Sequence, residues 1–291
     1  HSDEDRADFT GTSLYDDGVG YSRTVAANID SLIGGQVTAE LSDKLTAVVQ
    51  VIARLKPNGD YTPEVEWANL RYQFTPEFSI RVGRSVLSTF LVSTYRNIGY
   101  ANHWVRPPIE LYGLVPVTSR DGISANYTTA RGDMLNSIEI TYGENETDLV
   151  GGFSVAANDT WGIADTFELG DLTIHASHQA ATINTNLFDS LFAGFNSFGA
   201  AGAEITNRFD PNDSKITFTG VGASYDPGQW FMMAEWGQTK SNSISGEKNA
   251  TYVSGGRRFG RLTPYITLAS VRYDDLPVDN LLNVNALPPS L

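Results

Sequence analysis

Alternation of apolar and polar residues dominates the chain from about residue 31 to residue 273. The clearest example is the segment 45–55, where one face collects only Leu, Ala and Val while the other includes Gln50 and Arg54. A strict period of two indicates a β-strand with one face in an apolar phase and the other in a polar phase. The segment 67–74 repeats the pattern, and its polar face carries Arg71.

Arginine on the polar face of successive strands limits the choice of fold. A packed protein core rarely accepts arginine. The water-filled interior of a barrel accepts it readily, and a long loop folded into that interior would narrow the passage. The pattern therefore predicts an all-β protein, a transmembrane antiparallel up-and-down β-barrel around an aqueous pore.

The same rhythm predicts about twelve strands. Their connections alternate between short turns and longer loops, which is typical of outer-membrane barrels and not of Greek-key sandwiches. The predicted strands cover residues 31–41, 45–55, 67–74, 78–84, 123–128, 137–142, 161–168, 172–182, 215–225, 229–240, 250–258 and 262–273.

Three long connections interrupt the rhythm. The segment 85–120 is rich in aromatic residues and arginine, and the segment 184–213 is a loop of about 30 residues rich in Gly, Asn and Phe. A plain connection in a compact domain is shorter than this. Residues 149–157 also look like a strand, but we assign them to a long loop at 144–160, because a further wall strand would put a long loop on the rim of short turns. We expect no helix longer than two turns, and loops at 1–27 and 274–291.

The amino-acid composition distinguishes between fold classes less well than the alternation of apolar and polar residues does. The chain has 291 residues, 20 Lys and Arg against 34 Asp and Glu, and a formal charge of -14, which argues against non-specific binding of nucleic acid. Cysteine is absent, so disulfides and thiolate metal sites are excluded. No apolar run approaches the roughly 18 residues of a spanning helix, whereas barrel strands need only about 9–11 residues. A soluble β-sandwich would have a similar composition.

Two groups of side chains are candidates for the lining of a pore constriction. The first is a set of arginines on the predicted wall and in the long excursion: Arg71, Arg81, Arg84, Arg96 and Arg106. The second lies inside the excursion: Tyr95, Tyr100, His103, Trp104, Glu110 and Tyr112. Arg71 and Arg81 share the polar phase, whereas Arg84 falls out of it and is also consistent with a strand end. The alternatives are surface arginines paired with Glu64, Glu66 or Glu110, and an excursion that caps the barrel mouth from outside.

Candidate catalytic and metal-binding residues are sparse. His175 and His178 are three apart on a predicted strand, so their side chains point to opposite faces and do not chelate one metal together. His103 has no Ser or Asp partner at the spacing of a hydrolase triad. The acidic residues near the N-terminus do not form a calcium-loop pattern, and a solvated loop explains them better. We expect no enzymatic chemistry, no metal and no cofactor.

Three short motifs carry a family resemblance. They are Arg-Val-Gly-Arg at 81–84, Tyr-Arg-Asn-Ile-Gly-Tyr at 95–100 and Trp-Val-Arg-Pro-Pro-Ile-Glu-Leu-Tyr-Gly at 104–113. With them the chain resembles Gram-negative outer-membrane porins of the general porin superfamily. The resemblance implies a barrel of typically sixteen strands, often trimeric, with 85–120 as the loop folded into the lumen and Arg71 and Arg81 as wall residues. It also implies a single barrel domain over 1–291, with one strand before His1 and about three after Leu291.

These observations predict a diffusion channel for small hydrophilic solutes in a bacterial outer membrane, in contact with lipid and lipopolysaccharide. A homotrimer is expected from the resemblance, and the small outward residues Gly35 and Ala39 would suit it. The alternative is a soluble secreted β-sandwich, a carbohydrate-binding module with aromatic patches as platforms. The two differ in one property, because the apolar phase is exposed to lipid in the barrel and buried in the sandwich.

Net charge alone would predict a cation channel. Remote loop charges are screened within about 8 Å at physiological salt, whereas charges at a narrow point act through a low-dielectric wall. Because the arginines concentrate on strand faces and in the excursion, we predict a locally cationic constriction that favours anionic solutes. Glu66, Glu110 and Glu235 would neutralise part of it.

Overall fold

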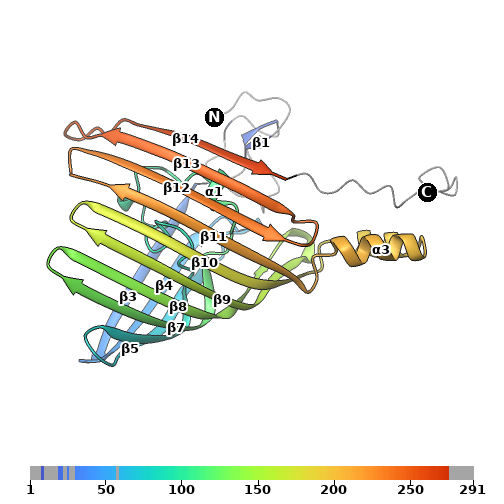
Figure 1. Ribbon diagram of the computed structural model, residues 1–291, viewed down its shortest axis with the longest axis horizontal. Coiled ribbons are helices and arrows are strands. Elements are labelled where there is room, and N and C mark those ends of the chain that lie inside the picture. The colour runs from blue at the N-terminus through green and yellow to red at the C-terminus, as the bar shows by residue number, and fades with distance from the viewer. Residues whose placement is uncertain (1–7, 10–18, 22–24, 26–29, 57–58, 275–291) are drawn as a thin grey trace.

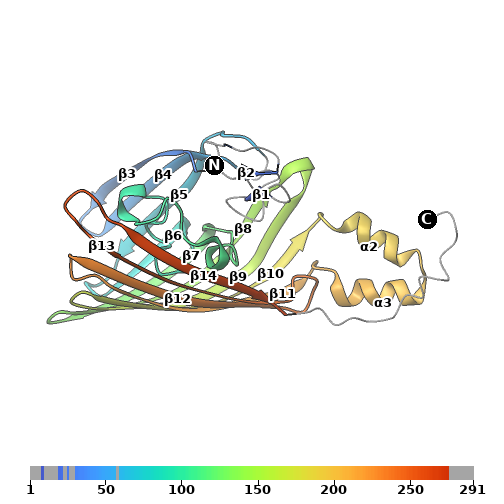
Figure 2. The ribbon, with the colours of Figure 1, turned by 90° about the horizontal axis from the view of Figure 1, so that it is seen from above.

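One twelve-stranded antiparallel sheet makes up most of the molecule. The computed structural model describes residues 8–9, 19–21, 25, 30–56 and 59–274. Each strand pairs with its neighbours in sequence, in the order β3 to β14, and Figures 1 and 2 show the sheet curved into a trough. The strands are β3 Leu32–Ser42, β4 Leu45–Arg54, β5 Glu64–Gln73, β6 Phe78–Val86, β7 Ser119–Arg131, β8 Met134–Asp148, β9 Ser154–Leu169, β10 Leu172–Thr185, β11 Ser214–Tyr225, β12 Trp230–Ser241, β13 Glu247–Arg257 and β14 Tyr265–Tyr273.

The predicted fold class is confirmed, and each of the twelve predicted strands is present. Several strands are longer than the alternation indicated, above all β7, β8 and β9. The sheet is open, because β3 and β14 each pair with one neighbour among the described strands. Part of the segment expected as an N-terminal loop forms a second, two-stranded sheet from β1 (Asp8–Phe9) and β2 (Val19–Gly20). Residues 1–7 and 275–291, also expected as loops, lie outside the described part of the chain.

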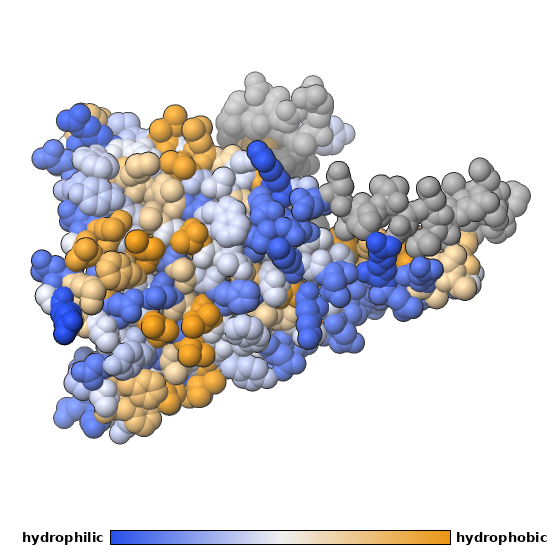
Figure 3. All heavy atoms as spheres, viewed as in Figure 1, coloured by the Kyte–Doolittle hydropathy of each residue, from blue (hydrophilic) through white to orange (hydrophobic). Residues whose placement is uncertain are grey.

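The two faces of the sheet differ as the alternation requires. The outer face exposes large apolar side chains, with Ile33 75%, Val82 55%, Ile140 57% and Leu268 71% exposed. Figure 3 shows apolar side chains gathered over the half of this face nearest the short turns, with hydrophilic ones toward the side of α3. A β-sandwich would bury these positions, so the arrangement favours the barrel.

Aromatic side chains of the outer face lie near strand ends. At the short turns, Tyr72 contacts Phe74 with ring centroids 4.7 Å apart, and Tyr225 contacts Trp230 at 5.3 Å. Rings with an apolar body and a polar edge are typical of the girdles of membrane barrels.

The predicted loop at 144–160 is wrong. Strands β8 and β9 continue through most of it, pairing as far as Asp148 with Ser154, and a 3-10 helix at Val150–Gly152 closes the hairpin. The register of this pair shifts between Gly143 and Asn145, and Asp159 has a positive φ of 47°. Such a bulge breaks the period of two and hides the continuation of a strand. The hairpin lengthens two wall strands and adds none.

The expectation of no helix longer than two turns is also wrong. Between β10 and β11 lie α2 (Asp189–Asn196) and α3 (Ala200–Phe209), and α3 has ten residues, close to three turns. Phe188, Phe192 and Phe195 follow helical spacing, which the surrounding Gly and Asn residues obscured. Figures 1 and 2 show the two helices projecting beyond the sheet. No described helix is long and apolar enough to cross a membrane.

Candidate functional site

The segment between β6 and β7 folds into the trough. This lumenal loop, residues 87–118, contains a 3-10 helix at Gly99–Ala101 and the short helix α1 (Ile109–Tyr112). Figure 2 shows it inside the curve of the sheet. Its apolar side chains form one buried cluster with the inner face of β11, β12 and β13. The cluster comprises Phe90, Leu91, Val92, Trp104, Leu111 and Tyr112 from the loop and Phe218, Phe231, Met233, Ala250 and Tyr252 from the strands.

A buried carboxylate anchors the middle of the lumenal loop. Glu235 of β12 is 4% exposed and accepts hydrogen bonds from the Leu91 N–H at 2.8 Å, the Tyr112 hydroxyl at 3.1 Å and the Tyr252 hydroxyl at 3.2 Å. A buried charge is tolerated when donors satisfy it in this way. Glu235 therefore fixes the lumenal loop to the inner face of β12.

Further hydrogen bonds hold the loop at both sides of the trough. On β10, the Ser177 hydroxyl donates to the Thr89 carbonyl at 2.6 Å and the Gln179 amide donates to the Thr89 hydroxyl at 2.9 Å. On β14, Thr267 accepts from the Trp104 indole N–H at 3.0 Å. The loop thus spans the inner face from β10 to β14.

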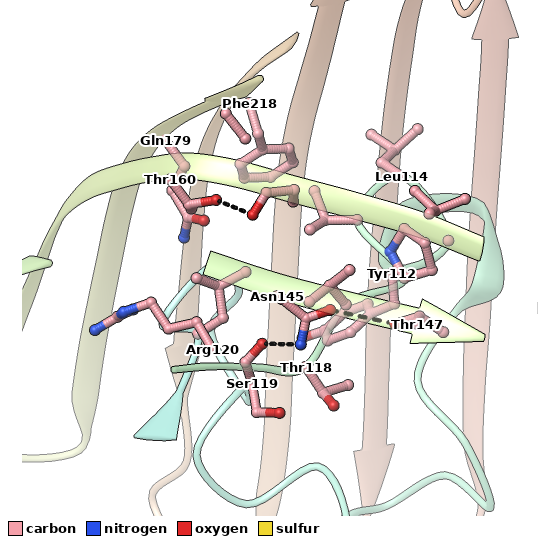
Figure 4. A pocket seen from close by; sticks show the side chains of 18 of the residues that line it. Tyr112, Leu114, Thr118, Ser119, Arg120, Asn145, Thr147, Thr160, Gln179 and Phe218 are labelled. Carbon is pink, nitrogen blue, oxygen red and sulfur yellow. Dashed lines mark hydrogen bonds between the residues drawn. The ribbon is translucent and has the colours of Figure 1, made fainter. Parts of the chain in front are cut away.

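A cavity of about 590 Å³ remains between the lumenal loop and the wall. Part of its lining is shown in Figure 4. Four acidic residues line it, Glu64, Glu66, Glu146 and Asp148, against seven basic ones. The basic residues are Arg54, Lys56, Arg84, Arg96, Arg106, Arg120 and Lys248. The lining residues alone carry a formal excess of three positive charges, and three of the basic ones form ion pairs with acids outside the lining: Lys56 with Asp60, Arg84 with Asp121 and Arg106 with Asp30.

The structure brings some of the predicted site residues to this cavity and separates others from it. Arg84, Arg96, Arg106 and Tyr112 line it. The remaining predicted residues lie elsewhere: Arg71, Arg81, Tyr95, Tyr100, His103, Trp104 and Glu110.

Three of those loop residues have clear environments. Trp104 is buried in the cluster, and His103 stacks on Phe231 with ring centroids 3.6 Å apart. Tyr100 is 95% exposed.

The wall arginines occupy two different faces. Arg71 and Arg81 are register partners on β5 and β6, and Arg81 lies 3.7 Å from Glu139 of β8. Arg84 shares the phase of the outward residue Val82 and forms a two-point ion pair with Asp121. Arg84 therefore lies on the outer face of β6, as its departure from the polar phase in the sequence indicated. Its side chain nevertheless reaches the edge of the cavity.

Acidic partners occupy several of the lining arginines. Arg54 lies 3.3 Å from Glu64 and 3.0 Å from Glu66, and Arg106 lies 2.7 Å from Asp30. The pairing with Glu64 and Glu66 considered from the sequence thus occurs at Arg54.

Arg120 is a lining residue that the pattern did not single out. It is the second residue of β7 and only 1% exposed, and none of its three guanidinium nitrogens has a hydrogen-bond partner among the residues that the structure describes. The sequence did contain a signal for Arg120. Arg120 lies an even number of residues before the inward-facing Ser124 and Asn126, so the alternation of the strand places it on the same inner face.

The two histidines on β10 face opposite sides. His175 contacts the Thr166 hydroxyl at 3.0 Å on the inner face, and His178 contacts the Thr219 hydroxyl at 2.8 Å on the outer face. Within the described residues, no group of three or more His, Cys, Asp or Glu side chains could hold a metal ion.

Comparison with solved structures supports the fold alone. No family model matches the chain, and no curated protein matches it. OmpF of Salmonella typhi, solved in complex with daunomycin, superposes with a TM-score of 0.52 at 15% identity over 83% of this chain and 71% of that one. An anion-selective porin from Comamonas acidovorans gives a TM-score of 0.43 at 12% identity over 86% of this chain and 81% of that one. The structural neighbours are Gram-negative outer-membrane porins, and the chain has their fold.

Proposed function

We propose that this chain forms a passive diffusion channel in the outer membrane of a Gram-negative bacterium and passes small hydrophilic solutes. The observation that carries the proposal is the lumenal loop, which is hydrogen-bonded across the inner face of a sheet whose outer face exposes apolar side chains. A loop held in this position narrows a passage without closing it, since a cavity of about 590 Å³ remains beside it.

The outer face suits lipid. Its exposed Ile, Leu and Val side chains gain free energy when they leave water, about 25 cal/mol per Å² of apolar surface. In a soluble β-sandwich the same residues would be buried, so that alternative is not favoured.

The open edges of the sheet require partners in a membrane. Lipid offers no hydrogen bonds to the free N–H and C=O groups of an edge strand, so spanning sheets are closed. We therefore propose that further strands pair with β3 and β14 in the membrane-embedded form, which agrees with the sixteen strands that the resemblance implies.

The constriction is proposed to be cationic. Seven basic against four acidic residues line the cavity, and a low-dielectric wall strengthens their field at short range. Arg71 and Arg81 extend this field along the lumen toward the short turns. The channel therefore favours anionic solutes, and the proposal involves no enzymatic chemistry.

The selectivity is tested by the reversal potential of the purified protein in a planar bilayer under a potassium chloride gradient. The parent is expected to prefer chloride. Arg96→Gln with Arg106→Gln, and separately Arg71→Gln with Arg81→Gln, should move the reversal potential toward zero or toward the cation side. Arg131→Gln, which removes an exposed arginine at a short turn, is the matched control and should leave it unchanged. A parent that prefers potassium would refute the cationic constriction.

The assembly is proposed to be a homotrimer. Gly35 and Ala39 lie on the outer face of β3, and Gly35 has no atom within 4 Å of the position of a Cβ, so two positions of this wall leave room for the side chains of a neighbouring protomer. Light scattering in mild detergent should give three times the mass of one protomer. A monomeric mass for an intact assembly would contradict the trimer.

A further inference from the structure

The turn between β13 and β14 is the only strongly basic turn among the short turns that the structure describes. It contains Arg257, Arg258 and Arg261, and no acidic residue lies in the stretch 257–264. Every other short turn carries an acidic residue: Asp43, Glu77, Asp133, Asp171 and Asp226. Figure 1 shows the basic turn at the end of the sheet opposite α3, together with the other short turns. In a chain with a formal charge of -14, such a cluster of arginines indicates an anionic partner.

Backbone hydrogen bonds close the turn and direct its apolar side chains to the outer face of the sheet. Phe259 and Leu262 exchange two hydrogen bonds, of 2.7 and 3.1 Å, around Gly260, whose φ of 61° suits a two-residue hairpin turn. The register that pairs the outward residues Val253 and Leu268 continues in step to this pair. Phe259 and Leu262 therefore also face outward, and they are 56% and 72% exposed.

Arg257 lies on the same outer face, beside aromatic rings at the strand ends. It is the register partner of Trp230, and its guanidinium carbon lies 5.2 Å from the centroid of the Phe259 ring. Arg257 and Arg261 are exposed, and neither has an acidic partner among the described residues. At the level of the interfacial aromatic rings of a membrane protein, the phosphate groups of lipids supply the nearest negative charges.

We propose that the turn 257–262 binds the headgroup of an anionic phospholipid, such as phosphatidylglycerol, in the leaflet at the short-turn rim. The proposal rests on the proposed function, because it needs the outer face of β13 and β14 to lie in lipid. The phosphate oxygens accept hydrogen bonds from the guanidinium groups of Arg257 and Arg261, whose planar forks match two oxygens of one phosphate. The glycerol backbone and the first methylene groups of the acyl chains pack against Phe259 and Leu262.

The remaining arginine of the turn is occupied within the chain. Arg258 lies 2.6 Å from Asp226 and donates a second hydrogen bond to that carboxylate at 2.7 Å. Its parity is opposite to that of Arg257, so it belongs to the inner side of the hairpin. The lipid headgroup is therefore assigned to Arg257 and Arg261 alone.

Charge and hydrophobicity together distinguish an anionic lipid from other partners. Phosphatidylcholine carries a quaternary ammonium group, which the two arginines would repel. Free phosphate would leave Phe259 and Leu262 exposed to water and gain nothing from them. An anionic lipid contacts the arginines and the apolar pair at once, and each arginine near an anionic lipid surface is worth about a fivefold preference.

Lipid retention by the purified full-length protein tests the proposal. Native mass spectrometry measures which lipid stays bound when phosphatidylglycerol and phosphatidylcholine with the same acyl chains compete. The parent should prefer phosphatidylglycerol by at least about tenfold, which two arginines at about fivefold each allow. Excess inorganic phosphate should not displace the lipid, and displacement would show that the turn is a simple anion site and overturn the proposal.

Variants separate the basic turn from the rest of the wall. Arg257→Gln with Arg261→Gln should abolish the preference for phosphatidylglycerol. Arg131→Gln, at a short turn where Asp133 supplies a negative charge, is the matched control and should leave the preference unchanged. Phe259→Ser with Leu262→Ser should weaken retention of both lipids and keep the preference.

Failure of the lipid site is distinguishable from failure of the channel. The circular dichroism spectrum establishes that each variant is folded, and conductance in a planar bilayer reports the channel. A conducting parent that retains both lipids equally, or an undiminished preference after Arg257→Gln with Arg261→Gln, would overturn the lipid site and leave the channel standing. Absence of conductance in the parent would instead refute the channel itself.

Discussion

Glu235 and Arg120 are the two inner-face charges whose surroundings differ most. Glu235 has three hydrogen-bond donors and holds the lumenal loop, whereas Arg120 has no partner among the described residues. The alternation of the sequence assigns both to the inner face by parity. It does not distinguish an anchor from an unpartnered charge, because that difference depends on the lumenal loop, whose Leu91 and Tyr112 lie more than a hundred positions from Glu235.

Removal of the Glu235 carboxylate should loosen the lumenal loop. Glu235→Ala leaves the Leu91 N–H and two tyrosine hydroxyl groups without an acceptor, which we expect to destabilise the fold by about 3 kcal/mol. Urea unfolding in detergent measures the change, and limited proteolysis within residues 87–118 should become faster. Glu168→Ala, at an exposed strand end, is the control. Unchanged proteolysis in Glu235→Ala would show that other contacts suffice to hold the loop.

Replacement of Arg120 should not destabilise the protein. A buried guanidinium group without hydrogen bonds contributes no stability, so Arg120→Gln should be neutral or slightly more stable in the absence of solute. A drop of more than about 2 kcal/mol in the free energy of unfolding would reveal a partner for Arg120.

The ion pair between Asp226 and Arg258 should make stability depend on pH. Hydrogen bonds from Arg258 and its positive charge hold the pKa of Asp226, in the turn after β11, below the usual 3.8. The pair therefore stabilises the fold above the ordinary aspartate pKa, and this contribution disappears as the pH falls through the depressed value. Because the pair is partly exposed, the contribution is about 0.5–1 kcal/mol. Parent and Asp226→Asn should differ in unfolding free energy at pH 6 and converge near pH 2; a constant difference would refute the linkage.

Among the elements of the fold, the alternation of apolar and polar residues was sufficient to predict each of the twelve strands β3 to β14. Each of these strands has one face toward lipid and one toward the lumen, which produces a repeat of two residues. It failed where a bulge changed the parity in β8 and β9, and where helical spacing in α2 and α3 was masked by Gly and Asn. The aromatic content of residues 85–120 indicated a packed loop. The strands that it contacts could not be predicted, because the pairing of Phe90 with Phe218 leaves no local signature.

Conductance should not depend on the packing of the helical hairpin α2–α3. A Cβ at Gly202 would lie 1.7 Å from the Phe195 carbonyl oxygen, so Gly202→Ala should force the two helices apart. We expect faster proteolysis within residues 184–213 and unchanged conductance, since the hairpin projects beyond the sheet (Figure 2). Gly194→Ala meets no atom within 4 Å and is the matched control. A large loss of conductance in Gly202→Ala alone would instead assign the hairpin to the permeation path.

At the scale of the whole molecule, exposure of the apolar face distinguishes a membrane barrel from a soluble protein. Ile140 is 57% exposed on the outer face of β8. In water, Ile140→Lys would be nearly neutral, but in lipid a lysine on this face should destabilise the barrel by about 2–4 kcal/mol. Urea unfolding from liposomes measures the change, with Ala130→Lys at a short turn as the control. Equal stability of the two variants would contradict immersion of this face in lipid.

Single-channel recording of the intact protein in a planar bilayer shows whether the trough encloses a passage narrowed by the lumenal loop. Discrete conductance steps with a preference for chloride are expected. Larger steps are expected after deletion of residues 99–101, an exposed stretch of the lumenal loop. Absence of steps in the folded, full-length protein would show that it forms no passage, and equal steps with and without the deletion would show that the loop does not narrow the passage.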